Sequence, residues 1–443
     1  MVNTLDLDLR PGSGLGPFEL GSSLFDVLAF LRRPSPPVFP SVSVKFDTAQ
    51  PTVSPIILHL RPHLDLLFTR HTQRLQTISL SLRRNTNSHP PLVLTYKNEV
   101  VAGPDVALRR TDVQRIMGPT FKGEGMKYPG VWYSFDEDAP IVGTTGNGAN
   151  NTDGNTEVKR VVVTQRENED AGKDDPSDEM ALVPVMYGDV KKAIAKVHDG
   201  VYLHFYSPDQ KAEPIYVQIG VTTAEDLTVE LGPPVLTHYK EDDRMAIHAT
   251  AKDDEESYFY NYFQYGIDFL ISGKTHRVRK IILHTNVPGS PLFQRYKRCP
   301  WEITLGTKDI SLAVPTPEIK LTPSPSRDSD VSSVRSSGKK KKKKAESTPE
   351  PEQARVSFEV QSSRPSMSEE DTIAFYDSID ILKNQLSSGS RHSPQSSMQL
   401  ERTADLPHHE LLTLPNATTH LYAFDGVVCE ASEVGDVLCV VLF

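Results

Sequence analysis

The chain has 443 residues, of which 37% are apolar and 34 are proline. Globular chains usually have about 45 to 50% apolar residues and about 5% proline, so part of this chain is expected not to pack into a core. The formal net charge is −10, from 48 basic and 58 acidic residues, which argues against a nucleic-acid-binding protein with a generally basic surface.

The cysteines and the first residues indicate a cytosolic protein. Cys299, Cys429 and Cys439 form no CxxC pair, so neither a disulfide framework nor a thiolate zinc site is expected. No run of residues is long and apolar enough to cross a bilayer, and the first residues lack the basic flank and apolar run of a signal peptide.

Residues 1–135 are expected to form the first part of an α+β domain, with two copies of a short helix and a β-hairpin. In the first copy, Ser22 and Ser23 are candidate N-caps of a helix that starts at Asp26. Alternating apolar residues then predict a hairpin from Leu64–Phe68 and Arg74–Leu80.

The second copy is interrupted by insertions in residues 136–180. Thr111 is the candidate N-cap of a helix over Asp112–Met117, and Gly-Pro follows as its stop signal. The predicted strands are Val131–Phe135 and 158–163. The intervening and following segments are expected to be loops, one rich in Gly and Asn at Gly143–Asn155 and one acidic at Glu167–Glu179.

Residues 181–314 are expected to form the second part, with a third and aromatic-rich copy. Thr222 and Thr223 precede a helix over Asp226–Leu231, which again ends at Gly-Pro. The hairpin Ile267–Ile271 and Arg277–Leu283 aligns without a gap on the first hairpin at an offset of 203 residues. Chance is the alternative, because a helix, a stop and a hairpin are common in sequence.

The remaining chain divides into a linker and a terminal piece. Residues 315–368 are rich in Ser, Pro and Lys, and we expect them to be disordered because they cannot bury enough apolar surface. Residues 369–443 are expected to complete the fold with a helix at Glu369–Leu386 and a hairpin at Gly426–Ala431 and Val437–Leu442. The predicted fold class is therefore α+β, with repeated short-helix plus antiparallel β-hairpin units packed together and disordered insertions.

Ser272-Gly273-Lys274-Thr275 resembles the end of a P-loop, which makes a nucleotide-binding enzyme the alternative function. The full motif needs a glycine at position 268, where this chain has Asp268, and a strand is predicted after the turn instead of a helix. The alternative is therefore disfavoured. We find no GxSxG or HExxH motif, and expect no enzyme activity, catalytic residue, cofactor or metal.

Two segments are candidates for binding. The stretch from Ser257 to Gly266 has six aromatic residues, and core packing is the default interpretation because aromatic side chains dominate protein cores. The candidate interaction surface consists of Tyr258, Tyr260, Tyr262, Tyr265 and Asn286. The lysine run is a solubilising, nuclear-import or anionic-lipid segment: Lys339, Lys340, Lys341, Lys342, Lys343 and Lys344.

The segments Tyr239–His248, Tyr258–Asp268, Val278–Gly289 and Tyr296–Cys299 resemble the phagosome assembly factor family. Leu5-Asp6-Leu7, Phe18–Gly21 and the Gly118 to Val131 segment also match, so the resemblance covers most of residues 1–310. The lysine-containing linker and the two insertions depart from the family pattern, and the chain stops at Phe443 where the family continues.

This resemblance implies a non-enzymatic scaffold or adaptor subunit. Family members bind a WD-repeat β-propeller protein and act at the phagophore assembly site in autophagy, or in Golgi and vesicle trafficking. The resemblance thus implies a cytoplasmic protein that associates peripherally with phagophore or endomembranes. It supplies no catalytic residues, and it does not locate the propeller contact.

Overall fold

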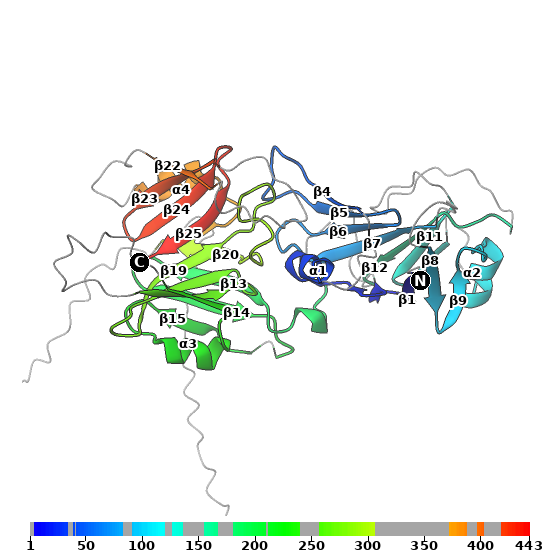
Figure 1. Cartoon of the computed structure of the whole chain (residues 1–443), viewed down its shortest axis with the longest axis horizontal. Coiled ribbons are helices and arrows are strands. Elements are labelled where there is room, and N and C mark those ends of the chain that lie inside the picture. The colour runs from blue at the N-terminus through cyan, green and yellow to red at the C-terminus, as the bar shows by residue number, and fades with distance from the viewer. Residues whose placement is uncertain are drawn as a thin grey trace, which may run out of the picture. The chain divides into compact units, whose positions relative to one another are not determined.

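Two halves with a similar order of elements make up the described part of the computed structural model. The structure describes residues 4–33, 39, 41–82, 91–119, 126–135, 155–166, 180–209, 211–239, 257–305, 372–387, 397–402 and 418–443. We call residues 4–166 the first half and residues 180–443 the second half. Figure 1 shows the first half in blue to cyan and the second in green to red.

The described residues of the first half form two sheets and two α-helices. The smaller sheet has the order β3-β2-β1-β8-β9, and the larger has the order β10-β11-β12-β7-β6-β5-β4. The strands are β1 (Leu5–Arg10), β2 (Gly14–Leu15), β3 (Phe18–Glu19), β4 (Ser41–Lys45), β5 (Ile56–Arg61), β6 (Leu64–Phe68), β7 (Leu75–Ser81), β8 (Leu92–Tyr96), β9 (Glu99–Ala102), β10 (Met126–Tyr128), β11 (Val131–Ser134) and β12 (Arg160–Thr164). The helices are α1 (Leu24–Leu31) and α2 (Arg110–Met117).

The second half repeats this arrangement with one additional strand in its larger sheet. Its smaller sheet has the order β15-β14-β13-β20-β21, and its larger sheet has the order β16-β17-β18-β19-β25-β24-β23-β22. The strands are β13 (Val190–Lys196), β14 (Gly200–Phe205), β15 (Ile215–Gln218), β16 (Leu236–Tyr239), β17 (Tyr258–Tyr262), β18 (Ile267–Ile271), β19 (Val278–His284), β20 (Trp301–Thr304), β21 (Thr372–Ala374), β22 (Met398–Glu401), β23 (Thr418–Phe424), β24 (Val427–Ser432) and β25 (Val437–Leu442). The helices are α3 (Ala224–Leu231), α4 (Ile379–Ser387) and the short 3₁₀ helix η1 (Pro184–Met186).

The two halves agree in details that strand order alone does not require. The parallel pair β1·β8 corresponds to the parallel pair β13·β20, and the other strand pairs among the described residues are antiparallel. A bulge interrupts β6·β7 between Leu67 and Phe68, and another interrupts β18·β19 between Leu270 and Ile271. The two bulges are 203 residues apart, which is the offset between the two hairpins. The bulge therefore occurs at the same place in both hairpins.

Each α-helix begins beside a hairpin. Single bridges join Ser23 to Arg74, Arg109 to Glu157, Thr223 to Arg277 and Ser378 to Asp436. The Ser23 and Thr223 side chains each accept a hydrogen bond from the backbone N–H three residues later, which satisfies an otherwise unpaired donor of the helix. The expected cap Thr111 is wrong, because α2 starts at Arg110 and the N-cap is Arg109, whose N–H donates to Asp112.

Each half has its own apolar core, formed by the buried face of its sheets and helices. In the first half, Leu58, Leu66 and Ile78 of three neighbouring strands are fully buried. In the second half, Phe269, Ile281 and Val440 play the same part. Alternation of buried and exposed residues along β1 and β5 explains why these segments form half-buried strands.

Four α-helices and several antiparallel sheets among the described residues agree with the expected α+β class. The repeated helix-hairpin units are not confirmed as separate units, since the equivalence in strand order relates two larger halves. The terminal helix begins at Ile379, later than expected, and the predicted strand 158–163 is Arg160–Thr164. The linker 315–368, the acidic insertion and nearly all of the Gly/Asn-rich insertion lie outside the described residues.

Candidate functional site

The aromatic residues expected to form an interaction surface are mostly packed inside the second half. Tyr262 has no exposed surface, and its hydroxyl donates to the Gly232 carbonyl at 2.9 Å. Burial raises the pKa of Tyr262 above its usual value. Tyr258 and Asn286 are also buried, whereas Tyr260 and Tyr265 are partly buried. The structure thus supports the core interpretation for Tyr258 and Tyr262, and any binding role of this group stays a prediction.

The turn Ser272–Thr275 connects two antiparallel strands, β18 and β19. Lys274 and Thr275 are exposed, and the Thr275 N–H donates to the Ser272 hydroxyl at 3.2 Å. A P-loop must open a helix whose N-terminal N–H groups hold phosphate, but strand β19 follows this turn. The turn geometry therefore gives no support to the alternative of a nucleotide site. The six lysines at 339–344 lie outside the described residues.

Asp268, His284 and Tyr296 form a buried polar group on the second half. The Asp268 carboxylate is 2.9 Å from His284 Nε2 and accepts a 2.7 Å hydrogen bond from the Tyr296 hydroxyl. The His284 ring stacks on the Tyr296 ring at a centroid distance of 3.7 Å. Burial and the neighbouring Asp268 raise the pKa of Tyr296. All three side chains are buried, so a substrate could reach them only after the surrounding chain had moved.

The cysteines are buried as well. Burial raises the pKa of Cys429 to about 12, and it raises the pKa of Cys299 and Cys439 above the usual thiol value. Because the thiolate is the reactive form, these side chains behave as small apolar residues. No group of three His, Cys, Asp or Glu side chains suited to a metal ion occurs in the part of the chain that the structure describes.

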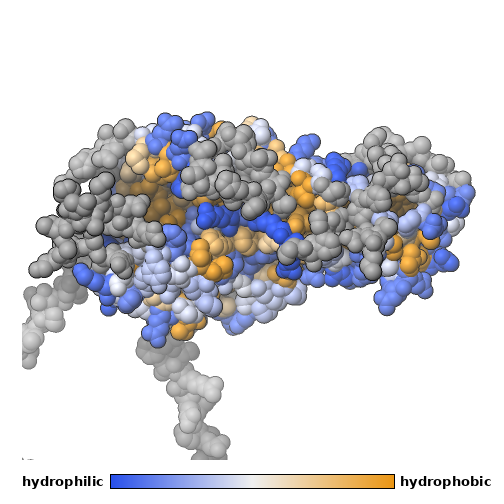
Figure 2. Space-filling view, viewed as in Figure 1, coloured by the Kyte–Doolittle hydropathy of each residue, from blue (hydrophilic) through white to orange (hydrophobic). Residues whose placement is uncertain are grey.

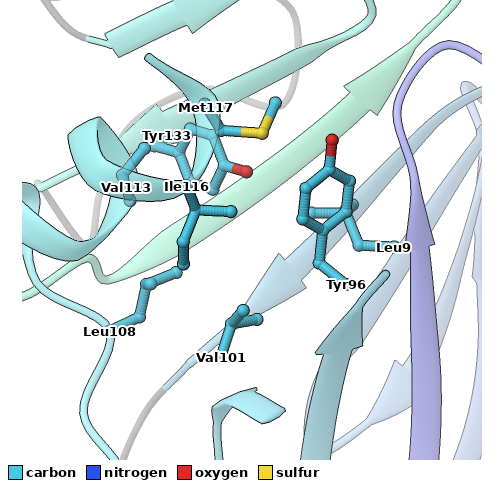
Figure 3. A pocket seen from close by; sticks show the side chains of 8 residues that line it. All are labelled: Leu9, Tyr96, Val101, Leu108, Val113, Ile116, Met117 and Tyr133. Atoms are coloured by element: carbon cyan, nitrogen blue, oxygen red, sulfur yellow. The ribbon is translucent and has the colours of Figure 1, made fainter. Parts of the chain in front are cut away.

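A small apolar cavity lies in the first half, between α2 and the strands β1, β8, β9 and β11 (Figure 3). Its volume of about 10 Å³ is at the lower limit for a single water molecule. A drug-sized ligand needs several hundred Å³. The cavity is lined by Leu9, Tyr96, Val101, Leu108, Val113, Ile116, Met117 and Tyr133.

An ionic cluster joins the two halves. Arg74, at the β6–β7 turn of the first half, contacts Asp189 of the second half at 2.6 Å. Lys297 contacts the same carboxylate at 2.8 Å and reaches Asp26 of α1 at 2.9 Å. Arg74 and Lys297 are both buried. Buried charges require such partners, so the cluster fixes this contact between the halves.

The connection between β19 and β20, residues 285–300, carries the rest of this contact. Arg298 donates to the backbone carbonyls of Thr52 at 3.1 Å and Arg70 at 2.6 Å. The Asn286 side chain donates to Gln73 Oε1 at 2.8 Å. Phe293 is fully buried within the apolar core of the first half. Asn286, expected at an interaction surface, therefore serves a contact within the chain.

Sequence reasoning did not single out Arg74, Asp189 or Lys297. The sequence did offer one signal of a buried ionic contact, the two adjacent cations Lys297 and Arg298. The structure shows that both residues and their neighbours are buried. Nothing in the sequence marks Arg74 and Asp189 as partners, because 115 residues separate them.

Several exposed apolar residues lie on helix α3 of the second half and on the edge strand β16 that follows it. Val229 is 76% exposed, Val235 60%, Leu236 45% and Tyr239 66%. We call Val235–Tyr239 the edge surface. Within the described chain, β16 pairs only with β17, so its outer backbone groups are open to another strand. On the face in view in Figure 2, apolar residues form several groups separated by hydrophilic ones.

These features define a class: a β-rich α+β protein whose described residues form two similar halves. No helix in the described ranges has the length and apolar character needed to span a bilayer. A family model described as phagosome assembly factor 1 matches residues 14–331. Since the match covers more than half of the chain, the chain belongs to the phagosome assembly factor 1 (PHAF1) family, as the sequence resemblance indicates.

Three relatives carry the same family name. A PHAF1 protein of Arabidopsis thaliana is 28% identical over 321 residues, which is 68% of this chain and 75% of the relative. PHAF1 proteins of Drosophila melanogaster and Caenorhabditis elegans are 38% and 36% identical, over 88 and 94 residues. These two matches cover 19% and 20% of this chain and only 20% and 22% of the relatives. No solved structure gives a significant match.

Proposed function

We propose that this protein is a non-enzymatic scaffold or adaptor subunit that binds a WD-repeat β-propeller protein and acts at the phagophore assembly site or in Golgi and vesicle trafficking. The observation that carries this proposal is the family match over residues 14–331. The family's description, phagosome assembly factor 1, refers to assembly and not to a reaction. The proposal includes a cytoplasmic protein that reaches phagophore or endomembranes as a peripheral component.

The edge surface is the proposed contact with the propeller partner. An exposed edge strand can accept a strand of another protein, whose backbone hydrogen bonds give affinity. Leu236 and Tyr239 provide exposed apolar area beside that edge, and aromatic side chains are enriched in interface cores. A partner that covered β16 would also remove the aggregation risk of an open edge.

Co-purification of the full chain from cells tests the proposal. Wild-type protein is expected to recover a WD-repeat protein under conditions that preserve weak complexes. The double variant Leu236→Glu, Tyr239→Glu is expected to recover at least about tenfold less, because two charges would be buried without partners. Val434→Glu, at another exposed apolar position, is the matched control and should retain the partner. Recovery of no WD-repeat protein by the wild type would contradict the proposed function.

A further inference from the structure

The two halves present equivalent ends that differ in what covers them. In the first half, Ser23, Asp26, Gln73 and Arg74 lie at the start of α1 and in the β6–β7 turn, and we call this the docked end. In the second half, Thr223, Asp226, His276 and Arg277 occupy the equivalent places, and we call this the open end.

The backbone geometry of the two ends is the same. Leu24 N–H donates to the Gln73 carbonyl at 2.9 Å, and Ala224 N–H donates to the His276 carbonyl at 2.8 Å. Gln73 and His276 have positive φ angles of 50° and 51°. The equivalence therefore extends to the residues that form each turn.

The two arginines are positioned in the same way. Arg74 donates to the Gly21 carbonyl at 3.3 Å, and Arg277 donates to the Gly220 carbonyl at 3.1 Å. These carbonyls belong to equivalent glycines, since Gly21 N–H donates to Leu75 and Gly220 N–H donates to Val278. Each guanidinium is thus held at its turn by one backbone acceptor.

The two arginines differ in whether a carboxylate is present as a second acceptor. Arg74 also pairs with the Asp189 carboxylate, and Asp26 receives Lys297. Arg277 and Asp226 are exposed, and neither has an ionic partner among the residues that the structure describes. The docked end therefore shows which groups an end of this geometry can bind: a carboxylate pairs with the arginine, and a cation pairs with the aspartate.

The chain does not repeat the surface that receives the docked end. In the second half that surface includes the connection 285–300, whereas the corresponding connection in the first half, 82–91, is six residues shorter. Residues 82–91 contain no Asp or Glu. In a second copy of the chain, Asp189 and Lys297 are already occupied by that copy's own docked end, which favours a different protein.

We propose that the open end binds a partner protein that places a carboxylate on Arg277 and a basic side chain on Asp226. This inference rests on the proposed function, because the partner is taken to be the assembly subunit. The open end adjoins the edge surface: His276 Nδ1 is 2.9 Å from the Tyr258 hydroxyl, and the Tyr258 and Tyr239 rings are 5.7 Å apart. One partner can therefore cover both.

Photocrosslinking of the full chain in cells tests this inference. The photoreactive residue p-benzoyl-phenylalanine replaces Thr275, which is exposed in the turn beside Arg277. The expected product is a crosslink to another protein, at a peptide that contains Asp or Glu. Arg277→Glu should lower its yield about tenfold, because a like charge now faces the partner's carboxylate. Arg115→Glu on α2, also at an exposed arginine, is the control and should leave the yield unchanged.

A charge exchange then completes the test. Replacing the crosslinked partner's acidic residue by Arg should restore the yield with Arg277→Glu. The inference is overturned if crosslinks form only within this chain, for example to its acidic residues 253–256, only to lipid, or not at all. It is also overturned if Arg277→Glu has no effect. If a WD-repeat protein still co-purifies in those cases, the proposed function stands and only the surface is wrong.

Discussion

The docked end and the open end have the same backbone geometry but opposite environments. Arg74 is 3% exposed and pairs with Asp189, whereas Arg277, held by an equivalent carbonyl, faces solvent. The difference arises from Asp189 and from the connection 285–300, which together cover the docked end. The connection has no counterpart of equal length in the first half. A duplicated local structure can thus serve as an internal contact in one copy and as a surface in the other.

The largest expected effect concerns Phe293, which the second half inserts into the core of the first. Phe293→Ala should lower the free energy of unfolding by about 3 to 5 kcal/mol, because it removes a fully buried ring and leaves a cavity. Urea unfolding measures this loss. Leu292→Ala, at a half-buried neighbour, should cost clearly less. Equal costs would contradict the insertion of Phe293.

The next largest effect concerns Arg74 and Arg277, the equivalent arginines of the docked end and the open end. Arg74→Ala should cost about 3 kcal/mol, because it leaves the Asp189 carboxylate with one cation fewer in a buried site. Arg277→Ala should change stability by less than about 0.5 kcal/mol, as exposed substitutions do. Urea midpoints of the two variants give the difference. Similar costs would mean that the ends do not differ as described.

The N-caps Ser23 and Thr223 test whether α1 and α3 begin in the same way at the two ends. Ser23→Ala and Thr223→Ala should each cost about 1 kcal/mol, because each hydroxyl accepts the N–H of the third residue of its helix. Thermal unfolding of both variants measures the loss. A cost at only one helix would break the equivalence of α1 and α3.

Thiol labelling should show the smallest effect. All three cysteines lie in the second half and are buried, and the raised pKa values keep them protonated at pH 8. Mass spectrometry after iodoacetamide treatment should find almost no labelling of native protein and full labelling in denaturant. Rapid labelling of Cys429 in native protein would show that the second half opens.

Local patterns predicted the hairpins well. Alternating apolar residues and the 203-residue offset located β6, β7, β18 and β19, and a bulge later appeared at the same place in both hairpins. The smaller sheets were not predicted, because β2 and β3 have two residues each and β1 pairs with the distant β8. Short strands carry too little alternation for a pattern to identify.

The candidate site was less predictable. Residues 258–262 are aromatic on both faces of a strand, so the pattern alone could not say that Tyr262 is buried. The contact between Arg74 and Asp189 depends on how whole halves pack, which no local signal encodes. The open end and edge surface were likewise visible only in three dimensions, because exposure depends on what the rest of the chain fails to cover.

A double-mutant cycle between Arg74 and Asp189 measures whether the second half holds the docked end in solution. The four proteins are wild type, Arg74→Ala, Asp189→Asn and the double variant, compared by urea unfolding. We expect a coupling free energy of about 1 to 3 kcal/mol, as for contacting charges in one network. Additive effects within about 0.3 kcal/mol would contradict it.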